Sequence, residues 1–184
     1  MIRFFDILIS VNAFIIFFPL FLILTIIGWI DTGAPILVQI RVGKSQKKFR
    51  IFKFRTMKTD TAFVPSHLVN KNALTKVGRI TRKLKFDELP QFINVMFGDM
   101  SIVGPRPCLP NQNILISKRQ KLNVYDVRPG ITGLAQIKGV DMSNPSLLSK
   151  LDAELVKSMN LKTYFKIIAL TIIGRGFGDR VNYN

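Results

Sequence analysis

The segment from Ile7 to Ile30 constrains this chain more than any other part of its sequence. Its 24 residues are almost entirely large and apolar. At about 1.5 Å per residue, a straight helix of this length crosses a bilayer's hydrocarbon core of about 30 Å. A secretory signal peptide is a poor alternative, because the apolar run exceeds the usual core of about 7–15 residues and no small-residue cleavage site follows it. We therefore expect the segment to lie in lipid.

Pro19 stands near the middle of this segment and allows two geometries. Proline removes the amide that would bond the carbonyl of Ile15, and so kinks a helix. Each half is then about 12 residues, or roughly 18 Å, which is close to the depth of one leaflet, so the chain can enter and return as a re-entrant hairpin. Positive charge on both flanks favours this geometry by placing both ends in the cytoplasm. A kinked spanning helix fits the same residues equally well.

Residues 31–184 carry the whole charge excess of the chain. The net charge is +16, and the first thirty residues contain only Arg3 and Asp6, which cancel. Such an excess attracts anionic partners, which include nucleic acid, lipid headgroups and phosphorylated substrates. The length suits one domain with its own core, so we expect a membrane segment over residues 1–30 and one domain over residues 31–184.

Cysteine and histidine offer little chemistry. Cys108 is the only cysteine, which excludes an intramolecular disulfide and fits a reducing compartment. The only histidine, His67, lies in a polar stretch without a metal-binding or triad pattern, and we expect it at the surface.

A basic stretch runs from Arg41 to Lys58, with eight cationic residues and no acidic one. Residues 49–55 largely alternate apolar and cationic side chains, which predicts a strand with one buried face. Lys53 and Arg55 would then point the same way and form a phosphate-binding rim. A solvated face beside anionic lipid is the alternative.

The turn before this strand is expected at Gly43-Lys44-Ser45, which gives a short hairpin with Ile36–Ile40. It is not a P-loop, because the required earlier glycine is Val38. Further on, the basic segment from Thr75 to Lys85, which includes Arg82, has apolar residues at helical spacing. It predicts a short amphipathic helix that brings cations to the next segment.

Asp87 and Glu88 precede the pattern Leu89, Phe92, Ile93 and Met96, which predicts a helix that begins at about Asp87 and stops at Gly98. Carboxylates at a helix start are often only caps. Here, however, they are nearly the only acidic residues between positions 41 and 98. An ionised aspartate among cations can attack phosphorus or hold a divalent metal.

Two later segments each present one arginine beside proline. Pro105 and Pro107 bracket Arg106, and Pro129 follows Arg128. Proline limits the backbone, so each guanidinium has a restricted direction, which suits recognition of a diphosphate. A tight turn with an exposed arginine is the alternative for each.

The stretch from Leu151 to Phe177 mixes apolar residues with lysines. Its continuous apolar run is too short to span a membrane. It predicts a helix at the membrane surface, with a buried core helix as the alternative. The glycine-rich run over residues 174–178 is not a dinucleotide loop, because no strand–turn–helix unit surrounds it.

Taken in order, these segments resemble the bacterial sugar transferases, which are monotopic phosphoglycosyl transferases. The resemblance covers nearly the whole chain. It runs through Arg3-Phe4-Phe5-Asp6, the apolar segment with its central proline, Phe52-Lys53-Phe54-Arg55-Thr56-Met57, Arg82-Lys83, Asp87-Glu88-Leu89-Pro90-Gln91, Gly98-Asp99-Met100-Ser101, Val103-Gly104-Pro105-Arg106-Pro107 and Arg128-Pro129-Gly130-Ile131-Thr132-Gly133-Leu134-Ala135-Gln136.

The resemblance implies a two-step transfer at the cytoplasmic face of the bacterial inner membrane. Asp87 would attack the sugar-bearing phosphate of a UDP-sugar with Mg²⁺ as cofactor, and UMP would leave. Polyprenol (undecaprenyl) phosphate would then take the sugar-1-phosphate from the enzyme, which initiates assembly of a surface glycan such as lipopolysaccharide or capsule, or of a glycoprotein glycan. A covalent intermediate of this kind divides one difficult step into two.

The same resemblance assigns further residues. Glu88 would assist the metal or the acceptor, Lys53 and Arg106 would bind phosphates, and Arg128 and Asp152 are further site candidates. Together with Arg55 and Arg82 these residues make up the expected site. The expected fold is a mainly helical α+β monotopic membrane protein, with a small β-hairpin, a re-entrant helix hairpin broken at Pro19 and amphipathic surface helices.

Two departures from the family pattern stand out. Phe18 replaces the serine that usually precedes the central proline, and Ile137-Lys138-Gly139-Val140 replaces the usual Val-Asn-Gly-Arg. The second change lies where contacts to the sugar are expected. The run Asp141-Met142-Ser143-Asn144-Pro145 is similar to relatives that act on N-acetylated amino or deoxyamino sugars.

Two rival functions use fewer of these features. A membrane-tethered nucleic-acid-binding protein would explain the charge, but the sequence has neither basic residues interleaved with stacking aromatics nor a recognition helix, and we expect no nucleic acid partner. A catalytically silent membrane scaffold would leave the acidic pair without a task.

Overall fold

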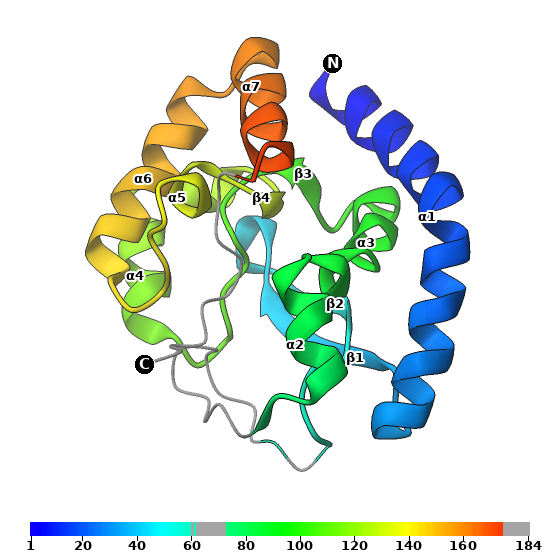
Figure 1. Ribbon diagram of the computed structural model, residues 1–184. Helices are drawn as coiled ribbons and strands as arrows, with labels where there is room; N and C mark the ends of the chain where they lie inside the picture. Colours follow the sequence, from blue (N-terminus) through cyan, green and yellow to red (C-terminus); the bar gives the residue numbers. More distant parts are fainter. Residues whose placement is uncertain (60, 62–72, 175–184) are drawn as a thin grey trace.

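The computed structural model describes residues 1–59, 61 and 73–174. Three sequence features lie outside the described residues. His67 lies wholly outside them, and so do the part of the expected helix beyond residue 174 and all but the first residue of the glycine-rich run over residues 174–178. Figure 1 shows a mixed, mainly helical architecture around two small sheets, in agreement with the expected α+β class.

Helix α1 (Ile2–Thr32) forms one side of the molecule (Figure 1). Among the described residues it is the only helix that is long and apolar enough to cross a membrane, judged by length and composition. Its outward side chains are exposed, among them Ile15, Ile16, Leu22, Ile26 and Trp29.

The re-entrant hairpin expected from Pro19 is not formed. Helix α1 is bowed but continuous, and Pro19 lies inside it. Proline has a φ that suits a helix and removes only one hydrogen bond, so it bends the helix without reversing it. Contacts at several points also hold α1 along the domain, because Phe21 packs on Phe54 with ring centroids 4.9 Å apart and Gly28 lies against Pro35.

Asp6 ties the start of α1 to the rest of the molecule. Its Oδ1 accepts hydrogen bonds of 2.9 Å each from Ser101 Oγ, the Ile102 amide and Tyr164 Oη. These donors come from strand β3 (Ser101–Val103) and helix α7 (Leu161–Ile172). Burial, and then the carboxylate of Asp6, raise the pKa of Tyr164, so its hydroxyl remains a donor.

The predicted hairpin is confirmed as strands β1 (Ile36–Val42) and β2 (Lys48–Phe54), joined by the 3₁₀ turn η1 (Lys44–Gln46). The predicted basic helix is also confirmed as α2 (Lys76–Lys83). Thr75 begins it by accepting a hydrogen bond from the Gly78 amide, which satisfies one free N–H of the first turn. The 3₁₀ turn η4 (Phe86–Glu88) and helix α3 (Gln91–Phe97) follow.

The second sheet is a pairing that the sequence did not predict. Strand β3 pairs in parallel with β4 (Gly130–Thr132), so the two segments that carry Arg106 and Arg128 lie side by side. The backbones meet at Gly104 and Gly130, where a Cβ on Gly130 would lie 2.1 Å from the Gly104 amide nitrogen. Only glycine allows this approach.

The C-terminal half of the domain consists of short helices. They are α4 (Asn113–Lys121), the 3₁₀ turn η5 (Val124–Asp126), α5 (Leu134–Ile137), α6 (Pro145–Ser158) and α7. The helix expected from Leu151 is therefore two helices, because Asn160 caps a new one by accepting from the Thr163 amide. Helix α7 buries one face and exposes Phe165 and Ile172 on the other.

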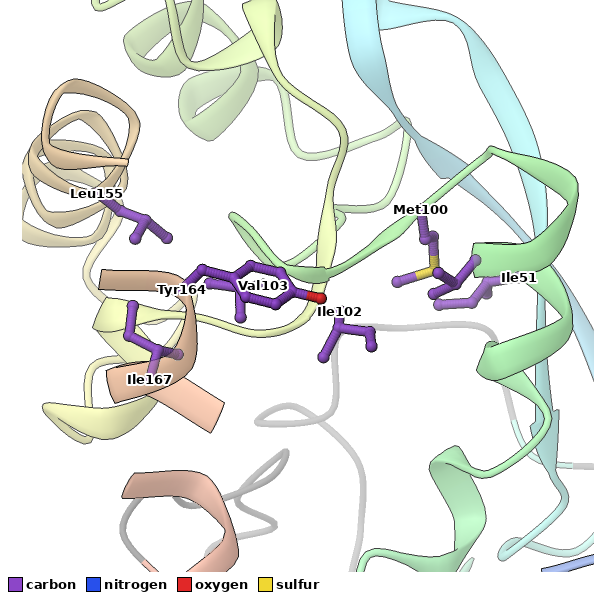
Figure 2. Close-up of a cluster of buried hydrophobic side chains, with 8 residues drawn as sticks. Ile51, Met100, Ile102, Val103, Leu155, Tyr164 and Ile167 are labelled. Atoms are coloured by element: carbon purple, nitrogen blue, oxygen red, sulfur yellow. The ribbon is translucent and has the colours of Figure 1, made fainter. Parts of the chain in front are cut away.

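The main core lies where α6 and α7 meet β3 and the hairpin (Figure 2). Figure 2 shows Tyr164 lying across β3 with its hydroxyl toward Ile102. The buried members are Ile51, Val95, Met100, Ile102, Val103, Leu155, Tyr164 and Ile167. Residues near the start of α1 pack on this cluster, so the membrane segment and the domain share one core.

We expect Asp6→Ala to lower the free energy of unfolding by roughly 3 kcal/mol, because it leaves the buried Ser101 hydroxyl and Ile102 amide without their acceptor. Thermal unfolding in detergent micelles measures the change. The exposed Asp126 provides the control, and Asp126→Ala is expected to stay within about 0.5 kcal/mol of the wild type. Equal melting temperatures for the two variants would contradict the prediction.

Candidate active site

Asp87 and Glu88 lie side by side in η4, between α2 and α3, and are only 6% and 9% exposed. Lys85, with φ of 60°, reverses the chain after α2 and so places this turn against β2. The sequence predicted an α-helix from about Asp87, but α3 begins at Gln91. The two carboxylates therefore precede the α-helix, and the electrostatics of the site depend on neighbouring cations more than on a helix dipole.

Glu88 is held between two cations from distant segments. Its Oε1 lies 3.4 Å from Lys53 Nζ and 2.6 Å from Arg106 Nη2. All three side chains are largely buried. Charges in such surroundings interact more strongly than at a surface, so each fixes the position of the others. Together with Asp87 the site holds two carboxylates and two cations, and the fixed cations favour contact with an anionic ligand.

The loop that carries Arg106 is held by its carbonyl groups. The Gly130 amide donates to Pro105 O at 2.9 Å, Arg119 Nη1 donates to Arg106 O at 2.9 Å, and Arg41 Nη1 donates to Pro107 O at 3.2 Å. The expected restriction of Arg106 by its prolines is therefore reinforced from three sides.

Asp152 does not lie beside Asp87 and Glu88 in a shared cluster of acids. It is 2% exposed, and its Oδ2 accepts from Arg119 Nε at 2.9 Å and Nη2 at 2.7 Å. Burial opposes the charge on Arg119, but the carboxylate of Asp152 together with Cys108 and Tyr125 outweighs it, and the pKa of Arg119 is raised. Sequence reasoning missed Arg119, since it lies in a run of polar and basic residues that reads as a solvated face.

Arg82 and Gln91 have buried donors that lack hydrogen-bond partners. They are Arg82 Nε and Nη1 and Gln91 Nε2. A buried donor without a partner costs about 1–3 kcal/mol, so such groups are common where a ligand completes the bonding. Gln91 begins α3 shortly after η4, and α2, which carries Arg82, contacts η4. This position supports the phosphate-binding role expected for Arg82.

The other two predicted arginines brace the backbone. Arg55 Nε donates to Ala34 O at 2.9 Å, where α1 connects to β1, and Arg128 Nε donates to Gly98 O at 2.7 Å, at the end of α3. The rim expected from Lys53 and Arg55 stays a prediction: Lys53 contacts Glu88, whereas Arg55 contacts the backbone at Ala34. Strand β2 ends at Phe54, and the alternation of side chains ends with it.

Magnesium is compatible with this donor set. Mg²⁺ prefers oxygen ligands and is usually held by one or two carboxylates together with substrate phosphates and water. The described part of the chain contains no group of three or more His, Cys, Asp or Glu side chains that would hold a metal alone. Asp87 and Glu88 are adjacent carboxylates, so they fit an ion that shares its coordination with a diphosphate.

Comparison with known proteins identifies a family to which this chain is similar. The chain matches the family model of the bacterial sugar transferases over residues 1–176. It is 40% identical to the sugar transferase EpsL of Bacillus subtilis (strain 168) over 141 residues, which are 76% of this chain and 69% of EpsL.

Two further relatives have names that state a reaction. One is the UDP-N-acetylgalactosamine-undecaprenyl-phosphate N-acetylgalactosaminephosphotransferase of Aeromonas hydrophila, 35% identical in an alignment that covers 95% of this chain and 44% of the relative. The other is the UDP-glucose:undecaprenyl-phosphate glucose-1-phosphate transferase of Escherichia coli (strain K12), 37% identical in an alignment that covers 82% of this chain and 34% of the relative. The chain thus spans less than half of either relative, but the family model matches nearly all of it, and it belongs to the bacterial sugar transferases.

Proposed function

We propose that this chain transfers a sugar-1-phosphate from a UDP-sugar to polyprenol phosphate and releases UMP. The observation that carries the proposal is the pair of buried carboxylates, Asp87 and Glu88, with Lys53 and Arg106 on Glu88. Both substrates are phosphate anions, and buried cations of fixed position bind such groups. The reactions stated in the names of the two longer relatives support the same assignment.

In the first step a carboxylate oxygen of Asp87 attacks the phosphorus that bears the sugar. A bond forms between this oxygen and phosphorus, and the bond from phosphorus to the bridging oxygen of the diphosphate breaks. The electron pair leaves on that oxygen as UMP. The resemblance assigns this task to Asp87 and an assisting role to Glu88, whose Oε1 contacts Lys53 and Arg106.

In the second step a phosphate oxygen of polyprenol phosphate attacks the same phosphorus. The aspartyl bond breaks, and the carboxylate of Asp87 is restored. No net proton is gained or lost by the enzyme over the cycle. Since the two anionic substrates react in turn, the cations of one site serve both.

The other predicted residues act on phosphate groups or through their neighbours. Lys53 and Arg106 contact the phosphates from the side of Glu88, and the buried donors of Arg82 complete the binding. Mg²⁺, when held by Asp87 and Glu88, neutralises charge on the diphosphate. Arg128 acts indirectly by holding the backbone at Gly98.

The membrane arrangement follows from how α1 packs. Asp6 near one end and Gly28 near the other both contact the domain, so a helix of roughly 46 Å lies along the domain over most of its length. A helix that crossed to the other side would carry one of these contacts out of the domain. We therefore favour a monotopic arrangement at the cytoplasmic face of the inner membrane, with the exposed face of α1 in lipid.

The sugar is expected to be an N-acetylated amino or deoxyamino sugar, and the product would begin a surface glycan. Ile137, Lys138 and the run from Asp141 to Pro145 form the connection between α5 and α6 and its flanks. A screen of UDP-sugars for UMP release identifies the donor and the reaction together.

We expect Asp87→Asn to lower UMP release by at least about 1,000-fold, because an amide oxygen is a poor nucleophile. Donor labelled in the sugar, quenched before acceptor is added, should leave one phosphosugar adduct on Asp87, located by mass spectrometry of peptides. Glu88→Gln is the matched comparison and should lose turnover while the adduct remains detectable. Full activity of Asp87→Asn would defeat the assignment of the nucleophile, whereas no UMP release by the wild type with any donor would favour the catalytically silent scaffold.

Chelation tests the magnesium assignment. Removal of divalent ions with EDTA is expected to reduce UMP release by more than about 100-fold, because charge on the diphosphate is then neutralised by side chains alone. Added Mg²⁺ should restore the rate, whereas Ca²⁺, with longer and less regular coordination, should restore it poorly. Undiminished turnover in EDTA would refute a metal-dependent reaction.

A further inference from the structure

We propose that Arg119, paired with Asp152, is a positioning residue for the transfer reaction: it holds the carbonyl of Arg106 and so aims the Arg106 guanidinium at Glu88 and the substrate phosphate. The inference rests on the proposed function, since it assigns Arg106 to phosphate binding. It gives Asp152 a task at a distance from the reacting atoms.

The loop that carries Arg106 offers few backbone groups by which it can be held. Pro105 and Pro107 have no amide hydrogen, so only the carbonyls of residues 105–107 and the Arg106 amide are available to fix this backbone. Gly130, Arg119 and Arg41 each donate to one of the three carbonyls. The bond at the middle carbonyl comes from Arg119, and it is the one closest to the side chain that contacts Glu88.

The space beside the loop points the same way. A small open cavity of about 10 Å³, close to the space that one water molecule needs, adjoins it and is lined by Pro105, Arg106, Pro107, Arg119 and Tyr125 among others. Packing beside the loop is therefore incomplete on this side. The hydrogen bond from Arg119 adds to the packing of the two buried prolines in keeping the Arg106 peptide in one orientation.

The buried pair of Arg119 and Asp152 has a geometry that fixes the direction of the third donor. Arg119 is 1% exposed and directs Nε and Nη2 to one oxygen of Asp152, which leaves Nη1 directed to Arg106 O. A planar guanidinium fixed by its counter-ion cannot rotate freely, so the third donor has a defined direction. A buried ion pair adds little net stability compared with apolar residues of similar size, so fold stability alone is a weak reason for this pair.

The test removes the pair without leaving a buried charge. Arg119→Met combined with Asp152→Leu keeps the volume and should fold, as checked by thermal unfolding. Loss of alignment at Arg106 is expected to weaken the binding of UDP alone, measured by calorimetry, and to lower kcat/KM for UMP release by about 10–100-fold. The donor is UDP-glucose or UDP-N-acetylgalactosamine, whichever the wild type turns over.

A double-mutant cycle separates positioning from a general structural role. In an Arg106→Ala background the same pair of substitutions should change UDP affinity and kcat/KM by less than about 2-fold, because the side chain that Arg119 positions is gone. An equal loss in both backgrounds, or no loss in either, would overturn the proposal. The matched control removes an exposed contact between the same two helices, the hydrogen bond from Lys118 to Ser146, by Lys118→Met and Ser146→Ala, and should leave both quantities unchanged.

A second variant keeps the proposal testable if the double variant does not fold. Arg119→Lys retains a positive charge beside Asp152, but one ammonium group lacks the fork that reaches both the carboxylate and the Arg106 carbonyl. It should show the same dependence on Arg106, and a fully active Arg119→Lys would also overturn the proposal. Since UDP binding needs no reaction at Asp87, failure of the nucleophile assignment is seen separately, in the missing phosphosugar adduct.

Discussion

The carboxylate of Glu88, placed between Lys53 and Arg106, is the contact on which the rest of the site depends. It joins strand β2, turn η4 and the loop after β3, which are separated by 35 and 18 residues of sequence. If Glu88 lost its charge, the two largely buried cations Lys53 and Arg106 would lose the carboxylate that they share. With the charge present, the cations are in place before a substrate arrives, so little reorganisation is needed during the reaction.

Short-range sequence patterns predicted the strands and helices that depend mainly on interactions between residues close in sequence. The hairpin β1–β2 follows from alternating side chains, and α2 follows from helical spacing with a capping threonine at Thr75. The acidic pair stood out because so few acids occur near it. Its link to Lys53 and Arg106 required the family resemblance, since no local pattern states which distant cation meets which carboxylate.

The features that sequence reasoning missed depend on contacts between distant segments. The parallel pairing of Ser101 with Gly130 joins two segments of three residues each, too short to show alternation. In the sequence, Arg119 looks like the solvated cations beside it. Only the packing of α6 shows that Asp152 pairs with it. The continuity of α1 depends on its packing against the domain, which the proline alone does not reveal.

The glycine contact between β3 and β4 has a consequence for how such enzymes diversify. Because Gly104 and Gly130 leave no room for a Cβ, the two arginine-bearing loops form one unit whose internal spacing cannot drift. Any change in the sugar that is accepted must then arise elsewhere, and the connection between α5 and α6 is free of that constraint. One rigid element would thus preserve the chemistry of the phosphates, while a separate, tolerant element adapts the enzyme to a new monosaccharide.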